Sequence, residues 1–329
     1  MIPVDFQHAP SPAKPAANAS PAGQAAYREQ LKQQNLNRLT IGSFARLRAL
    51  VPDGRRVIFV GDGSFTNHAV INGRPPNSIH IGRSRKDLAL HHLPAQTPAP
   101  HTGRRRVYGA AAPTPEALRT DDTVPWQTFE AFAAGQPHTF RVKTLGPVLW
   151  RKTGSGRPLL VMVIAPLGYR LRKGQRMLYR KPAYLLCTDP NLPLAELLQA
   201  YLWRWGVEVN FRDEKTIIGT GDAQVRTTSS NQHLPAVTVA ACALLWVAAL
   251  GLLAGGGRLP TLDPPKWRKD RQAAGQLPST GELLRLLRYE LWAGALRPGT
   301  FFHFATKSPP VTSGQKPAPD LAATLFSSN

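Results

Sequence analysis

The stretch from residue 201 to residue 215 constrains the fold most, because it places four chemically active side chains at helical spacing. These are Tyr201, Arg204, Glu208 and Lys215, in the pattern Y-x2-R-x3-E-x6-K. At about 100° per residue of α-helix, the last three lie within roughly 60° to one side of the first. The sequence therefore predicts a helix that presents a phenol, a carboxylate and two cations on one narrow stripe.

An apolar stripe lies beside these four residues and predicts how the helix is held. Leu202, Trp205 and Val209 recur at helical spacing, so a helix over residues 194–215 can pack them against a core. A carboxylate can hold a divalent metal, and Arg, Lys and Tyr can hold a phosphate. The alternative is a surface helix with ordinary charge pairs.

The four residues resemble the Tyr-Arg-Glu-Lys signature of bacterial insertion-sequence transposases of the DDE type. In that family an RNase H-like core carries three carboxylates, which bind two divalent metals for DNA strand cleavage and transfer. The resemblance makes Glu208 the third carboxylate, and it places Tyr201, Arg204 and Lys215 on phosphates near the transposon end. It also implies Mg²⁺ or Mn²⁺ as cofactor, DNA as partner and a homodimer on DNA.

Two upstream segments extend the resemblance, which covers the chain from about residue 1 to about residue 255. Residues 56–67 resemble the strand that ends in the family's second catalytic Asp, so Asp62 is the second expected metal ligand. Residues 78–87 resemble the strand that follows, with Arg83 as a further expected DNA contact. An Asp-Gly pair between apolar runs is also a hairpin signal, so a simple turn at Asp62 is the alternative.

The family's first catalytic Asp has no counterpart here. It lies on a strand well upstream of the second, whereas only 61 residues precede Asp62. We therefore expect an N-terminally truncated and inactive copy. Asp5, Asp87 and Asp189 are rival carboxylates: no family position makes Asp5 the first ligand, and the other two are expected to be structural or solvated.

Composition limits the class of protein. A net charge of +21 over 329 residues favours a polyanionic partner such as nucleic acid, or an acidic membrane surface. Two cysteines form no disulfide framework or zinc site, and the N-terminus lacks a signal peptide, so a cytoplasmic protein is expected. A phosphate-binding loop and an H-E-x-x-H zinc motif are both absent from the sequence.

The run from residue 234 to residue 254 contains no charge and is long enough to cross a bilayer. Pro235, Thr238 and Gly251 interrupt it, and alanine supplies much of the rest, which gives little drive for insertion. These features favour a buried core helix, and membrane association remains the alternative.

The resemblance and the sequence patterns together predict an α/β fold with an RNase H-like core, incomplete at its N-terminus. The expected parts are the N-terminal core 1–88 with a linker at 9–26, a β-rich insertion 89–193, the core helices 194–255, and a C-terminal helix with a disordered tail 256–329.

Within these parts, we expect one helical segment at 27–50 and irregular chain at 89–135. Strands are expected at 138–150, 159–164 and 181–188. Ser279 and Glu282 have capping-box spacing, which predicts a helix start there.

Three functions follow as hypotheses: a transposase, a noncatalytic DNA-binding remnant that competes with intact transposase, and a basic membrane-associated protein. The first two share DNA as the ligand and differ in catalysis. The third depends only on the apolar run 234–254.

Overall fold

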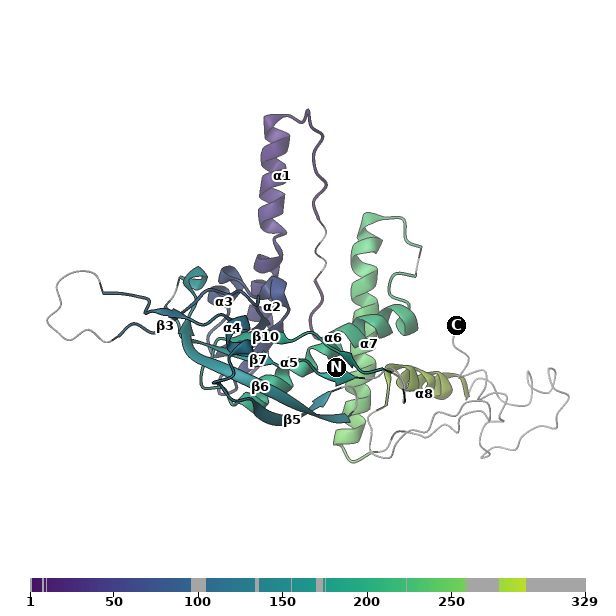
Figure 1. Cartoon of the computed structure of the whole chain (residues 1–329). Coiled ribbons are helices and arrows are strands. Elements are labelled where there is room, and N and C mark those ends of the chain that lie inside the picture. The colour runs from purple at the N-terminus through teal and green to yellow at the C-terminus, as the bar shows by residue number, and fades with distance from the viewer. Residues whose placement is uncertain are drawn as a thin grey trace. The chain divides into compact units, whose positions relative to one another are not determined.

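The chain has a mixed α/β structure (Figure 1). It divides into two compact units. Residues 7–207 make up the first, here called the sheet unit, and residues 1–6 with 208–329 make up the second, the helical unit. The computed structural model describes residues 2–7, 9, 11–95, 105–133, 136–154, 156–169, 174, 176–222, 224–257, 259 and 278–293. The expected α/β class is confirmed at this level.

The sheet unit is built on a mixed eight-stranded sheet. Its strands are β1 (Val57–Gly61), β2 (Ser78–Arg83), β3 (Leu90–His92), β4 (Ala111–Ala112), β5 (Gln127–Ala133), β6 (Gln136–Leu149), β7 (Leu159–Ile164) and β10 (Ala183–Cys187). They lie in the order β1-β2-β10-β7-β6-β3-β4, and β5 pairs with β6. Only β1 and β2 are parallel among the described pairs. A separate ribbon joins β8 (Gly168–Tyr169) to β9 (Leu178–Tyr179).

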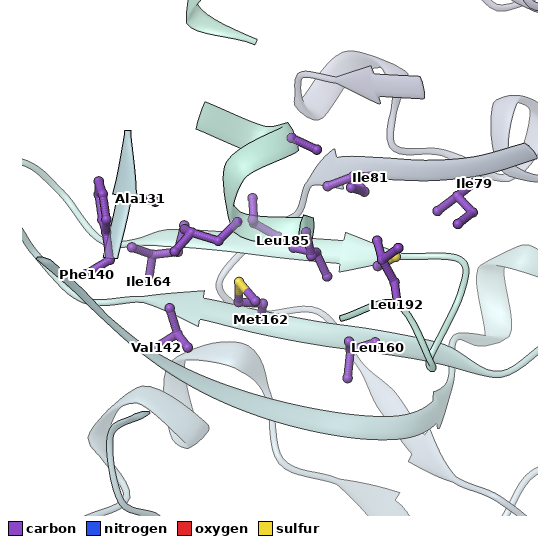
Figure 2. Close-up of a cluster of buried hydrophobic side chains, with 14 residues drawn as sticks. Ile79, Ile81, Ala131, Phe140, Val142, Leu160, Met162, Ile164, Leu185 and Leu192 are labelled. Carbon is purple, nitrogen blue, oxygen red and sulfur yellow. The ribbon is translucent and has the colours of Figure 1, made fainter. Parts of the chain in front are cut away.

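Strand β7 is buried along its whole length, because both faces of the sheet are covered. Its six residues read Leu-Leu-Val-Met-Val-Ile without a polar position, as expected for a strand that has no solvent face. On one face Leu160, Met162 and Ile164 join a cluster with residues of β2, β6 and β10 (Figure 2). The other three side chains face a second cluster with Leu186 and Leu118. The predicted strands at 138–150, 159–164 and 181–188 are thus confirmed.

Helices cover both faces of the parallel pair. Helix α5 (Leu194–Trp203) places Leu197 and Leu198 in the cluster that includes Ile79 and Ile81 of β2. On the opposite face, α2 (Leu36–Ala49) stacks Phe44 on Phe59 of β1 with ring centroids 3.8 Å apart. Helix α3 (His68–Gly73) follows β1 and contacts α2.

The N-terminal helices correct two expectations. The segment 27–50 is two helices, because Asn35 interrupts it and caps α2 through the N–H of Asn37. Helix α1 (Pro21–Gln33) begins inside the expected linker 9–26, where Ser20 accepts the N–H of Gly23 and Pro21 occupies the first turn.

The expectation of irregular chain at 89–135 is wrong. This range contains β3, β4, β5 and the short helix α4 (Pro115–Thr120), which Thr114 caps through the N–H of Ala117. In α4, Glu116 accepts two hydrogen bonds from Arg119, at 2.7 and 2.9 Å, and one from the Tyr184 hydroxyl on β10. The Arg119 and Tyr184 hydrogen bonds lower the pKa of Glu116 to about 2, so the carboxylate stays charged.

Lys143 ties β6 to the end of α4 from a fully buried position. Its ammonium group donates to the carbonyls of Arg119, at 3.2 Å, and Asp121, at 2.5 Å. It also lies 4.7 Å from the centre of the Trp126 ring. A buried cation of this kind is tolerated because each partner offers negative potential.

Replacing Lys143 by Met should lower the free energy of unfolding by about 2–3 kcal/mol, since two buried carbonyls lose their donor. Urea unfolding followed by near-ultraviolet circular dichroism measures the change. The control is Arg141→Met, on the same strand, whose exposed guanidinium lies 5.6 Å from the same Trp126 ring. Equal losses in the two variants would show that the carbonyl contacts of Lys143 contribute nothing.

In the described part of the helical unit, two helices pack against each other. Helix α7 (Thr228–Ala254) packs Cys242, Trp246 and Ala249 against Leu283 of α8 (Thr280–Ala293). The predicted capping box is confirmed, because the Ser279 N–H donates to Glu282 at 2.6 Å and the Glu282 N–H donates to Ser279 at 3.3 Å.

Within the described residues α7 is buried along one side, so the expected core helix at 234–254 is borne out for that side only. The helix has 27 residues. Its most apolar stretch of 18 residues has a mean hydropathy of 2.4, and 17% of that stretch is buried. Its length and composition suffice for a membrane span, as they do for a core helix of a soluble protein. Val237, Leu244, Val247 and Leu252 are exposed along its other side.

Candidate functional site

The predicted helix 194–215 is interrupted twice. Helix α5 ends at Trp203 and α6 (Trp205–Asp213) begins two residues later, with Arg204 between them in helical conformation. The Arg204 N–H donates to the Tyr201 carbonyl at 3.2 Å, a tightened turn of the i→i+3 kind. A π-helical segment, Glu214–Ile218, then holds Lys215, so a spacing of 100° per residue no longer applies to that side chain.

The boundary between the two units falls within α6. Tyr201 and Arg204 belong to the sheet unit, whereas Glu208 and Lys215 belong to the helical unit. The first two are close, since the Arg204 guanidinium lies 5.9 Å from the centre of the Tyr201 ring. Glu208 and Lys215 are both exposed. The predicted closeness is confirmed for this first pair, and the place of Glu208 and Lys215 on the same stripe stays a prediction.

The predicted apolar stripe of Leu202, Trp205 and Val209 does not pack as one unit. Leu202 packs against the sheet cluster, as expected. Trp205 does not, because after the turn at Arg204 its side chain is 52% exposed, and the Arg180 guanidinium lies 5.8 Å from its ring centre. Val209 is half-buried.

A pocket of about 650 Å³ opens beside this turn, entirely within the sheet unit. Its lining comes from the end of β2, from β5, β6, β7, β8 and β10 with the segments beside them, and from α5, α6 and the turn between these helices. The lining residues are Arg83, Ala133, Gln136, His138, Phe140, Ile164, Ala165, Leu167, Gly168, Tyr169, Arg180, Lys181, Ala183, Tyr201, Leu202, Arg204 and Trp205. Three predicted residues from two distant parts of the sequence, Arg83 on one side and Tyr201 with Arg204 on the other, thus meet in one cavity.

The chemistry of this pocket is cationic and aromatic. Arg83, Arg180, Lys181 and Arg204 contribute four positive charges, and the described lining contains no carboxylate. Arg180 lies 5.5 Å from the ring centre of Tyr169, and its second aromatic neighbour is Trp205. Cations held over ring faces can bind an anion, and exposed rings can stack on a planar group.

Asp62 directly follows β1, as predicted. Strands β1 and β2 form no hairpin, but the alternative of a turn residue at Asp62 is borne out. Strand β1 pairs in parallel with β2, and Asp62 starts a 3-10 turn (Gly63–Phe65) by accepting the Ser64 N–H at 2.8 Å. The side chain is exposed. Because Gly61 is in register with Gly82, Asp62 and Arg83 follow side by side at the carboxyl ends of the two strands. Asp62 itself does not line the pocket, but it lies beside Arg83, which does.

His80 is a residue of this region that the sequence analysis missed. Its ring is fully buried in β2, and neither ring nitrogen has a hydrogen-bond partner in the described part of the chain. A Cβ at Gly82 would lie 2.8 Å from Nε2, and one at Gly61 would lie 3.3 Å from Cε1. The imidazole therefore lies under the two strand ends that precede Asp62 and Arg83, and both glycines leave room for it.

The rival carboxylates have structural partners. Asp87 accepts two hydrogen bonds from Arg85, at 2.7 and 2.9 Å. Asp189 accepts from Arg56 at 3.3 Å and from the Asn191 N–H at 2.9 Å. The structural interpretation of both is confirmed, and Asp5 lies in the helical unit.

Metal binding stays a prediction. Within the described ranges, no group of three or more His, Cys, Asp or Glu side chains is arranged to hold a metal ion. Asp62 and Glu208 offer the hard oxygen ligands that Mg²⁺ and Mn²⁺ prefer, but they belong to different units. Their approach to within about 7 Å, which a shared two-metal site requires, is untested.

Several pocket residues were not predicted. The basic cluster 170–180 is visible in the sequence but is as typical of a solvated surface, and Tyr169 carries no local signal. Only the fold shows that Arg180 and Lys181 lie near Arg204. No protein-family model matches the chain, and a search of curated proteins finds no match either.

The buried His80 predicts a pH dependence of stability. Burial, with a smaller contribution from the Arg74 charge, lowers the pKa of His80 to about 4, whereas an unfolded imidazole titrates near about 6.5. Between these values the unfolded chain binds a proton that the folded chain does not. The free energy of unfolding should therefore fall as the pH drops from about 6.5 towards 4.

In a His80→Leu variant, this fall should shrink by roughly 2–3 kcal/mol. Urea unfolding at several pH values measures it, and His92→Leu, at an exposed position, should keep the parent dependence. An unchanged pH profile in the His80→Leu variant would contradict the buried neutral imidazole.

Proposed function

We propose that this protein binds DNA as a member of the DDE transposase type, through the pocket at the α5–α6 turn. The observation that carries the proposal is the meeting of Arg83, Tyr201 and Arg204 in one cavity. The resemblance made each of them an expected DNA contact, and Arg83 is separated from the other two by more than a hundred positions of sequence. Arg180 and Lys181 add two cations to the same wall.

The electrostatics of the chain support a phosphate ligand. Arginine side chains bind phosphate oxygens in pairs of N–H donors, and lysine binds them as a point charge. The pocket combines both types, and the whole chain carries a net charge of +21. A DNA strand supplies repeated phosphates together with bases that can stack on Tyr169 and Trp205.

The arrangement around β1 supports an RNase H-like core. A parallel strand pair ends in Asp62 and Arg83, and helices α2 and α5 cover its two faces. In the proposed site Asp62 and Glu208 are ligands for Mg²⁺ or Mn²⁺, with a homodimer on DNA as the assembly. When bound, these ions stabilise the attacking and leaving oxygens of a phosphoryl transfer.

Binding without cleavage is the activity we propose for this chain. No residue is assigned as the third carboxylate, because Asp87 and Asp189 are held by Arg85 and Arg56. In this proposal the third carboxylate position is unfilled, so a second metal would have too few ligands. Arg83, Arg204 and Tyr201 would still hold a phosphate, and the protein would compete with an intact transposase for the same DNA.

A membrane-associated protein is the second candidate, and the exposed apolar side of α7 is the observation that favours it. Separation of membrane and soluble fractions of cells that express the chain distinguishes the two. Recovery with the membranes after a high-salt wash would favour α7 as a membrane anchor over the DNA-binding proposal.

DNA binding should depend steeply on salt and on the pocket arginines. Replacing Arg83 or Arg204 by Ala should weaken binding and lower the slope of log affinity against log salt by about one unit, if each neutralises one phosphate. Lys215→Ala should act in the same way. Fluorescence anisotropy, with duplex DNA from the sequence that flanks the gene, measures both quantities.

The control for Arg83 is Arg85→Ala, two residues along the chain. Arg85 is exposed, pairs with Asp87 and does not line the pocket. It should leave the salt slope nearly unchanged. Binding that is insensitive to salt, or an equal loss from Arg83→Ala and Arg85→Ala, would count against the pocket as the DNA site.

Cleavage should be absent. The purified 329-residue chain with Mg²⁺ or Mn²⁺ should leave a supercoiled plasmid that carries the flanking sequence intact, because the metal site lacks a ligand. Agarose gel electrophoresis shows nicked product directly. Metal-dependent nicking that is lost in an Asp62→Asn variant would overturn the noncatalytic assignment, and Asp5, Asp87 and Asp189 would become candidates for the third carboxylate.

A further inference from the structure

Strand β1 is the outermost strand of the sheet in the part of the chain that the structure describes. It pairs with β2 on one side, and no described strand lies on the other. Its five residues, Val-Ile-Phe-Val-Gly, contain neither a charge nor a proline. An edge strand of this composition is a template for pairing with another chain, since it lacks the usual features that block such pairing.

The direction of the backbone N–H and C=O groups decides which residues of β1 can form hydrogen bonds with a further strand. The Val57 N–H donates to the Asn77 carbonyl at 3.3 Å, towards β2. Because backbone groups alternate in direction along a strand, Phe59 also bonds towards β2, whereas the N–H and C=O groups of Ile58 and Val60 point to the open edge. The described chain offers these edge groups no hydrogen-bond partner.

Opposite charges flank the strand at its two ends. Arg56 precedes β1 and Asp62 follows it, and both are exposed. They lie three residues before and three residues after Phe59, so their side chains share one face of the strand. Arg56 contacts Asp189 at 3.3 Å and Glu196 at 3.8 Å, but a guanidinium has five N–H donors and can accept a further partner.

We propose that β1 pairs antiparallel with β1 of a second copy of this chain, centred on Phe59, so that two sheets become continuous. In this register Ile58 lies opposite the partner's Val60, and their edge groups exchange hydrogen bonds. Arg56 lies opposite the partner's Asp62, and the symmetry repeats this ion pair at the other end. A strand of unrelated sequence would match the hydrogen bonds but not both charges.

The faces of β1 are compatible with such pairing. Phe44 of α2 stacks on Phe59 on one face, and α5 covers the other, so the strand presents only its edge. The pairing does not depend on DNA binding or on a metal site. Its failure and the failure of the proposed function are therefore separate outcomes.

Hydrogen exchange combined with sedimentation velocity tests the proposal on the full chain. We expect a monomer–dimer equilibrium in which the amides of Ile58 and Val60 gain protection as the concentration rises. The amides of Val57 and Phe59 face β2 and should be protected at every concentration, so they report that the sheet is intact.

Charge variants test the register. Arg56→Glu places two carboxylates opposite each other in both pairs and should weaken the dimer about tenfold. Arg55→Glu makes the same charge change one residue away, on the other face, and should leave dimerisation unchanged. Asp62→Arg should weaken the dimer likewise, and the double variant Arg56→Glu with Asp62→Arg should restore it.

Four results would overturn the proposal. They are a monomer at all concentrations, a dimer whose Ile58 and Val60 amides stay unprotected, protection that does not change with concentration, and equal effects of Arg56→Glu and Arg55→Glu. The third result would show that a segment of the same chain already covers the edge.

Discussion

The parallel pairing of β1 with β2 is the contact on which the candidate site depends. Because parallel strands end at the same edge of a sheet, this pairing brings Asp62 beside Arg83. The pair is held from both sides, by the Phe44–Phe59 stack and by α5, whose C-terminal end carries Tyr201. The fold thereby places Asp62 beside Arg83, which lines the same pocket as Arg204.

Local signals were sufficient for part of this fold. Strands β6, β7 and β10 are visible because their β-branched and apolar runs meet the requirement of a strand that is buried on one or both faces. Helix α8 is visible because Ser279 and Glu282 satisfy each other's backbone donors. The region 89–135 could not be predicted, because its elements are short and depend on distant partners such as Tyr184 for Glu116.

The candidate site, too, could be predicted from the sequence only in part. Helical spacing was enough to place Arg204 near Tyr201, since only one turn separates them. The break at Arg204, the exposure of Trp205 and the approach of Arg180 depend on tertiary packing, which no periodicity records. His80 was missed because a lone histidine in an apolar strand looks the same whether it supports a site or fills a core.

The position of Arg180 between two aromatic rings affects how selective the pocket can be. Its guanidinium lies near the ring centres of both Tyr169 and Trp205, so the aromatic faces restrict the rotation of a side chain that would otherwise sample many rotamers. A ligand then meets donors whose orientation is already set, and it loses less entropy on binding. Lysine at this position would keep the charge but lose the planar fork, so this wall of the pocket can discriminate by geometry as well as by charge.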